Sequence, residues 1–233
     1  MATLRLFAAA APRRIYVPGN HELWALGQSE TAARERYFHD LPRIARAAGY
    51  HPLVTEPVVF DDVGFVGTMG WYDYSFASPA DGFSADELAA KSRDGLQWMD
   101  GRFVRWRGPD GAAMTDPEVA DLMVEDLRDQ IGALARTELR TMVLVTHHLA
   151  FQNLVPPVFV DGHLRFFRAF LGSTRLGEAA RAEPRISLAL AGHVHSVRSS
   201  QEGHILARTC PTGYPRERKP GVAAADRRLV LEI

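Results

Sequence analysis

Three short apolar runs in this chain end in the same way, and this ending constrains the fold more than any other feature. Each run is followed within three residues by His or Asn: 15–18 by Gly19-Asn20-His21-Glu22, 142–145 by Thr146-His147-His148, and 186–190 by Ala191-Gly192-His193-Val194-His195. Runs of this kind, bounded by Gly and Pro, predict strands. Because α/β proteins keep their chemistry on the loops after strand ends, we expect an α/β fold with its site at these three ends.

The rest of the chain predicts helices and strands joined by short turns, with one long irregular segment. Gly, Pro, Ser and Asp interrupt 70–116, and a connection this long in a compact domain tends to be functional, so we predict an excursion or lid there. The chain shows no repeat and no clean linker, so we expect a single domain over 1–233.

The expected elements follow from periodicity and from capping residues. The expected helices are a helix end over 2–11, one capped by Ser29 and ending at Phe38, one that Pro42 starts or kinks and that ends at Gly49, a short one over 86–92, an amphipathic one capped by Asp116 and opened by Pro117, and a pair over 164–171 and 175–181. The expected strands are 13–18, 58–60 and 63–68 with a turn at Asp61-Asp62, 141–146, 186–190, 205–208 and 229–233.

Composition narrows the class of protein. With 46% hydrophobic and 24% charged residues among 233, the chain has the make-up of a folded soluble protein. A net charge of −1 offers no basic field, so nucleic acid is not a favoured partner. Cys210, the single cysteine, excludes an internal disulfide framework, and no apolar run reaches membrane-spanning length. The N-terminus makes a poor signal peptide. We therefore expect a cytoplasmic protein without a membrane partner, and its oligomeric state stays open.

The histidines after the strands are candidate metal ligands. Histidine is the commonest transition-metal ligand, and Gly192 removes a side chain where the backbone must turn closely around an ion. A lone His-x-His is more often coincidence than a metal site. His or Asn recurs in all three strand-end loops, and this recurrence strengthens the hypothesis of a metal site.

The three blocks, in this order, resemble the last three signature blocks of the calcineurin-like metallophosphoesterases. The resemblance covers about 13–195. It implies a layered sandwich of two mixed β-sheets flanked by helices, with two divalent metal ions (Mn, Fe or Zn) at the strand ends. It further implies a hydrolase, either a phosphatase or a phosphodiesterase, that cleaves a small phosphoester with metal-activated water.

The resemblance also assigns roles to the matching residues. The implied metal ligands are Asn20, His147 and His193 for one ion and His195 for the other. His21 would act as general acid or charge stabiliser beside the leaving group, with Glu22 as a partner that orients it. His148 is left near the pocket without a role, and the substrate-binding residues are unknown.

Two earlier blocks of the family pattern, Asp-x-His and Gly-Asp-x-x-Asp, have no counterpart in residues 1–18. The chain holds one Asp-x-His, Asp161-Gly162-His163, for which a surface turn is the simpler interpretation. We therefore interpret the chain as N-terminally truncated, with the first strand-helix units missing. Without a bridging carboxylate, no negative charge holds two dications together, so one weakly bound ion and little hydrolysis are expected.

Several alternatives stay open. A catalytically dead relative that serves as a binding or scaffold module is the main rival to an enzyme, and a generic structural zinc site would leave Asn20 and His21 without an explanation. The aromatics of 71–74 could line the pocket or pack in the core. A cluster of Arg102, Arg105 and Arg107, and the basic loop 214–219, could approach a phosphate or simply face solvent.

Overall fold

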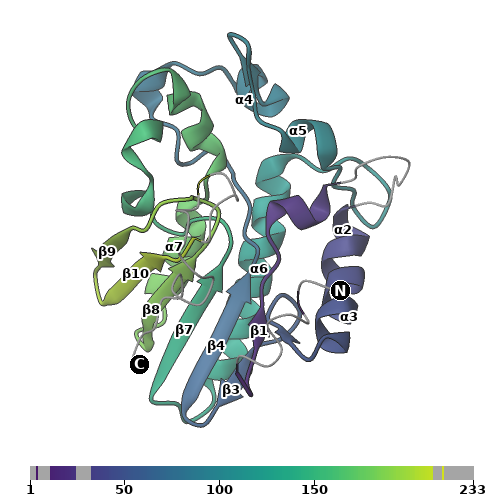
Figure 1. The fold of residues 1–233 in the computed structure, drawn as a ribbon, viewed down its shortest axis with the longest axis vertical. Helices are drawn as coiled ribbons and strands as arrows, with labels where there is room; N and C mark the ends of the chain where they lie inside the picture. Colours follow the sequence, from purple (N-terminus) through teal and green to yellow (C-terminus); the bar gives the residue numbers. More distant parts are fainter. Residues whose placement is uncertain (1–3, 5–10, 25–32, 212–216, 218–233) are drawn as a thin grey trace.

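A mixed sheet of six strands, in the order β3-β4-β7-β8-β10-β9, forms the centre of the fold (Figure 1). The computed structural model describes residues 4, 11–24, 33–211 and 217. The four inner strands are parallel neighbours, and an antiparallel strand lies at each edge. In sheet order the strands are β3 (Val58–Phe60), β4 (Val63–Thr68), β7 (Thr141–Thr146), β8 (Ile186–Ala191), β10 (Ile205–Thr209) and β9 (Ser199–Glu202).

The predicted strands are confirmed where the sequence is apolar. The bounds of β3, β4 and β7 equal the predicted ones, and β8 and β10 each extend one residue further. The turn between β3 and β4 is tight enough to place Asp61 at φ 56°. The edge strand β9 was missed because Ser199-Ser200-Gln201-Glu202 carries no apolar pattern. The predicted strand over 229–233 lies outside the described residues.

The strand before Gly19 is shorter than predicted. β1 covers only Ile15–Tyr16 and pairs in parallel with β2 (His51–Pro52) rather than with the large sheet. Pro18, two residues after the end of β1, has no N–H with which to extend the ladder. The described residues therefore form an α/β fold, as expected, but they do not form the second large sheet of the expected sandwich.

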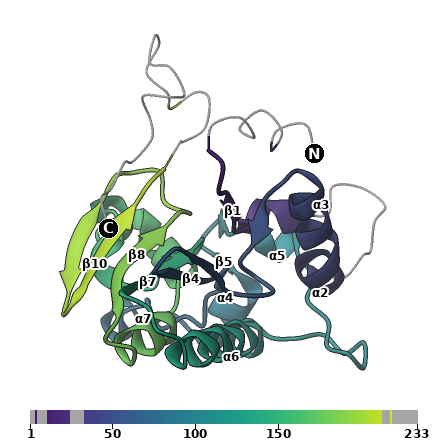
Figure 2. The same ribbon diagram turned by 90° about the horizontal axis from the view of Figure 1, so that it is seen from below.

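Helices α6 (Asp116–Ala135) and α7 (Thr174–Arg181) lie along one face of the large sheet (Figure 2). α6 is the predicted amphipathic helix, but the prediction that Asp116 caps it is wrong. Thr115 is the N-cap: Glu118 N donates to its hydroxyl, and Thr115 N donates to the Glu118 carboxylate. This capping box satisfies two N–H groups at once, and it releases Asp116 for contacts with the interior.

The helical region after the first loop is continuous. α2 (Ala33–Glu35), a π-helical turn over Arg36–Asp40 and α3 (Leu41–Ala47) follow one another without a break, so Pro42 does not start a separate helix. Pro42, which has no N–H, comes two residues after the π-helical turn, where the regular α-helical hydrogen-bond pattern is already interrupted. The predicted cap at Ser29 lies outside the described residues, as does the helix end over 2–11 apart from Leu4 and Ala11.

The segment 70–116 is folded, not open. It contains α4 (Ala85–Ala90), the small hairpin of β5 (Ser92–Arg93) and β6 (Leu96–Gln97), and α5 (Asp100–Phe103). Its first residues are core: Trp71, Tyr72 and Phe76 are buried. None of the helices in the described part of the chain has the length and apolar character needed to cross a membrane.

Candidate metal centre

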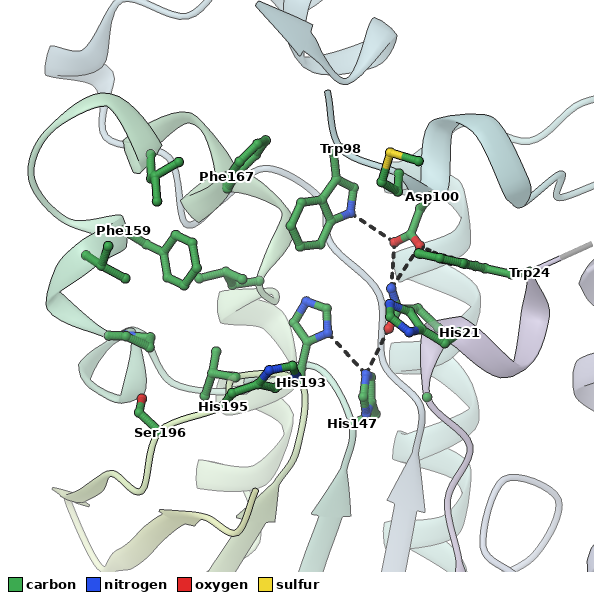
Figure 3. A pocket seen from close by; sticks show the side chains of 18 of the residues that line it. His21, Trp24, Trp98, Asp100, His147, Phe159, Phe167, His193, His195 and Ser196 are labelled. Carbon is green, nitrogen blue, oxygen red and sulfur yellow. Dashed lines mark hydrogen bonds between the residues drawn. The ribbon is translucent and has the colours of Figure 1, made fainter. Parts of the chain in front are cut away.

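Two parallel strands of the large sheet, β7 and β8, bring the second and third sequence blocks to one edge, and the turn after β1 places the first block beside them. β7 ends directly before His147, and β8 ends directly before Gly192 and His193. The turn after β1 meets these ends, and a cavity of about 790 Å³ opens over them (Figure 3). The predicted residues that line this cavity are Asn20, His21, Glu22, His147, His193 and His195. Blocks far apart in the sequence therefore share one pocket.

Asn20 is the buried polar residue of the first block. It begins a 3-10 turn that the Glu22 carboxylate stabilises by accepting the Gly19 N–H at 2.7 Å. The Asn20 Nδ2 donates to the two carboxylate oxygens of Asp100 at 2.8 and 3.0 Å. The Asn20 Oδ1 consequently faces Nε2 of His147, 3.0 Å away.

The imidazole of His147 fits between two glycines. A Cβ built on Gly19 would lie 2.7 Å from its Cε1, and one built on Gly192 would lie 3.1 Å from its Nδ1. The His147 backbone N–H donates to the Met69 carbonyl just beyond β4, at 3.2 Å. Neither glycine position can carry a side chain without moving this ring.

His193 completes the group through an uncommon backbone conformation. Its φ is +66°, a left-handed value that costs free energy for a residue other than glycine and that recurs at functional sites. In this conformation the His193 Nδ1 lies 3.1 Å from Nε2 of His147. The Gly192 N–H donates to the carbonyls of Thr146 and His147, which holds the loop against the end of β7.

Asn20 Oδ1, His147 Nε2 and His193 Nδ1 form what we call the donor triad. As hydrogen-bonding partners the three atoms fit poorly, because Oδ1 can only accept and a single N–H on His147 cannot serve both neighbours well. As metal ligands they fit well, since atoms about 2.1 Å from one ion and at right angles to each other lie about 3 Å apart.

The chemistry of the triad also suits a metal. Burial, with nearby histidines, lowers the pKa of His147 well below its usual value and that of His193 to about 3, so both imidazoles are neutral and keep a lone pair. Among the described residues, no three side chains taken from His, Cys, Asp and Glu alone are grouped to hold a metal. The third donor is the Asn20 amide, and this mixed set fits one Mn, Fe or Zn ion.

His21 lines the same cavity from the exposed side of the turn. Its ring packs on Trp24 with 3.9 Å between the ring centroids. The contact of Glu22 with the Gly19 N–H stabilises the turn on which His21 sits. The roles assigned to His21 and Glu22 stay predictions.

The two remaining histidines of the blocks differ in their surroundings. His195 lines the cavity, and its Nδ1 lies 2.8 Å from Oε2 of Glu217. His148 is fully buried, with its ring against Trp71 and Tyr72 and its Nδ1 3.3 Å from the Met69 carbonyl oxygen. His148 is therefore a core residue behind the site.

Asp100 is the site residue that the sequence interpretation missed. It begins α5, is 1% exposed, and lies between two indoles: Trp24 Nε1 donates to its Oδ1 at 2.6 Å and Trp98 Nε1 to its Oδ2 at 2.9 Å (Figure 3). Burial raises the pKa of Asp100, while these donors lower it. Asp100 places a carboxylate behind the Asn20 amide and does not bridge two ions, so the expectation of one weakly bound ion stays a prediction. The only sequence feature that could have indicated Asp100 is its place two residues after Trp98, inside the irregular segment.

The wall opposite Asp100 is apolar. Figure 3 shows Phe159 and Phe167 across the pocket from Asp100 and Trp24. Segment 156–171 supplies the apolar residues of this wall, which are Pro156, Val158, Phe159, Leu164, Phe167 and Leu171. The pocket therefore has a polar base and one apolar wall.

Other candidates lie away from the cavity. Trp71 and Tyr72 are core residues, and Arg105 and Arg107 donate to backbone carbonyls of Gly101 and Gly111. The turn Asp161-Gly162-His163 is exposed and does not line the cavity, in agreement with a surface turn. Of the basic loop 214–219, only Glu217 is described.

Comparison with known proteins identifies the fold and no closer relationship. No protein-family model and no curated protein sequence matches the chain. Among solved structures, the phosphopantetheinyl hydrolase of Mycobacterium tuberculosis is similar with a TM-score of 0.73 and 22% identity, over 94% of this chain and 77% of that one. The GAP50 anchor protein of the Plasmodium inner membrane complex aligns over 86% of this chain and 71% of that one, at 10% identity, but its TM-score of 0.29 is too low to support an argument.

Proposed function

We propose that this chain is a metal-dependent phosphoester hydrolase. The observation that carries the proposal is the donor triad at the base of the pocket. In it, the neutral imidazole nitrogen of His147 lies 3.0 Å from the amide oxygen of Asn20 and 3.1 Å from the imidazole nitrogen of His193. The three motif blocks and the fold shared with a phosphopantetheinyl hydrolase support it. A divalent ion bound by the triad supplies a Lewis acid for a phosphoryl oxygen and for water.

Residues around the triad have separate roles in the proposed reaction. His21, on the exposed side of the turn, donates a proton to the leaving oxygen or stabilises its charge. The triad accounts for one ion, and a second ion beside His195 is part of the proposal for a complete family site. A single bound ion in this chain would give slow turnover.

The apolar wall points to the kind of ester. A small phosphoester whose leaving group carries an apolar or extended uncharged chain can place that chain against Phe159 and Phe167 while its phosphate meets the histidines. Phosphopantetheine esters, suggested by the similar structure, have such a chain. We expect p-nitrophenyl phosphate or its diester to be cleaved faster than an ester of a charged alcohol.

The proposal is tested by bound metal and by hydrolysis. Elemental analysis after loading with Mn²⁺ should find about one ion per chain, and His147→Ala should remove it. His21→Ala should keep the metal and lower hydrolysis of bis-p-nitrophenyl phosphate by about 100-fold or more. His163→Ala, on the exposed turn outside the cavity, is the matched control and should change neither. Two tightly held ions would contradict the single-ion site, and metal binding without turnover would favour the scaffold alternative.

A further inference from the structure

We propose that Asp100 is a positioning residue that fixes the orientation and charge of the Asn20 amide, and so makes Asn20 Oδ1 a metal ligand. The inference rests on the proposed function, because it assigns a role at the same site. It concerns a residue from the irregular segment that none of the three motif blocks contains.

The hydrogen bonds of Asp100 exclude a direct ligand role. Its Oδ1 accepts from Asn20 Nδ2 and Trp24 Nε1. Its Oδ2 accepts from Asn20 Nδ2, from Trp98 Nε1 and, at 3.4 Å, from the Tyr72 hydroxyl. With both oxygens surrounded by donors, the carboxylate acts on its neighbours rather than on the pocket directly.

The orientation of the Asn20 amide follows from this arrangement. A side-chain amide presents either its oxygen or its NH₂ group to a given neighbour, and the hydrogen-bond network decides which. If the Asn20 amide were turned over, its oxygen would face the Asp100 carboxylate and its NH₂ group would face His147 and His193. Asp100 therefore selects the orientation in which a lone pair joins the two imidazoles.

The charge of Asp100 adds a second contribution. Among the described residues, no lysine or arginine pairs with this carboxylate, which is 1% exposed. A hydrogen bond from an amide to a buried anion polarises the amide and increases the negative charge on its oxygen. Such partners behind metal ligands change metal affinity by about 10-fold to 100-fold.

The test exchanges the two side chains. Asp100→Asn should weaken Mn²⁺ binding, measured by titration calorimetry, by about 10-fold to 100-fold. Asn20→Asp combined with Asp100→Asn restores an amide–carboxylate pair with its charge on the ligand side, and should recover affinity to within a few-fold. Asp116→Asn, at a buried carboxylate outside the cavity, is the matched control and should leave Mn²⁺ affinity unchanged.

A readout without metal keeps this proposal separate from the proposed function. Hydrogen exchange of the Asn20 side-chain NH₂, followed by NMR in the metal-free protein, should speed up about tenfold or more in Asp100→Asn. Unchanged exchange, or Mn²⁺ affinity within about twofold of wild type in folded Asp100→Asn, would overturn the positioning role. Equal loss of affinity in the single and exchanged variants would also overturn it. Failure of the wild-type protein to bind Mn²⁺ would refute the proposed function, and the exchange rates would still decide the role of Asp100.

Discussion

Asp100 and Asp116 lie in one stretch of chain and have similar partners, yet they differ in what balances their charge. Both are buried, and both accept hydrogen bonds from indole N–H and tyrosine O–H groups. Asp116 is also paired with Lys91, whose ammonium is itself largely covered. Asp100 has no lysine or arginine partner in the described part of the chain, and it holds Asn20 instead.

This difference separates a structural role from a functional one. A buried carboxylate with its own cation closes a local network, and Asp116 thereby ties α6 to Lys91 and to the aromatics Trp71 and Tyr74. A buried carboxylate without a cation makes its surroundings favourable for positive charge. Asp100 does this in direct contact with Asn20 of the donor triad, so the two carboxylates should respond differently to mutation.

The largest effect is expected on stability at Asp116. Asp116→Ala leaves the Lys91 ammonium buried without its partner and should lower the free energy of unfolding by about 3–5 kcal/mol. Urea denaturation followed by circular dichroism measures this change in the free energy of unfolding. Asp62→Ala breaks the exposed pair with Arg140 and is the control, with little change expected. Similar midpoints for both variants would remove the distinction drawn for Asp116.

The pH dependence of stability should arise on the Asp100 side of the comparison, where buried histidines gather. The folded-state pKa values of His147, His148 and His193 lie below the usual 6.5, so below that pH the unfolded chain binds more protons. In metal-free protein, stability should therefore fall as pH drops below about 6.5, by up to about 1.4 kcal/mol per pH unit for each histidine.

Urea titrations between pH 7.5 and about pH 4.5 measure this slope. His148→Gln removes one of the three groups and should reduce the slope by up to about a third. Asp100 has the opposite effect on stability. Its pKa is raised in the folded state, so the folded chain holds this proton more readily than the unfolded chain does. The stability that Asp100 contributes is therefore present at low pH and is lost as the pH rises above 3.8. A slope of zero across the range would contradict the buried, neutral histidines.

Gly19→Ala should separate the metal site from general stability. The added Cβ would meet the His147 ring at 2.7 Å, so the ring must move and Mn²⁺ affinity should fall by about 10-fold to 100-fold. Gly132→Ala is a matched control in α6, where a Cβ meets no atom within 4 Å, and it should stabilise the protein by up to about 1 kcal/mol. Calorimetry of both variants makes the comparison, and unchanged affinity in Gly19→Ala would argue against His147 as a ligand.

The smallest effects compare one hydrogen bond at each carboxylate. Trp71→Phe removes the indole donor to Asp116 and should cost about 1–3 kcal/mol of stability without changing Mn²⁺ affinity. Trp24→Phe removes a donor to Asp100 and should lower Mn²⁺ affinity several-fold. Equal effects of the two substitutions on affinity would show that the carboxylates do not differ in the way described.

Much of the fold could be predicted because apolar strands carry their own signal. The runs at 141–146 and 186–190 are largely buried and are bounded by turn residues, so their ends could be placed to within a residue. The polar edge strand β9 and the capping box of Thr115 could not be read in this way, because neither depends on apolar periodicity. The segment 70–116 was predicted to be irregular, and its hairpin and α5 were missed for the same reason.

The sequence by itself determined which residues gather at the site. His147 and His193 follow the apolar runs of β7 and β8, which are parallel neighbours in the large sheet, and Asn20 follows the apolar run that ends at Pro18. Only the tertiary structure decided that Asp100 joins them, that His148 turns into the core, and that Phe159 and Phe167 face the histidines. The reason is physical: strand periodicity acts between neighbours in the chain, whereas the burial of a carboxylate depends on donors from Trp24, Asn20 and Trp98, which only the folded chain brings together.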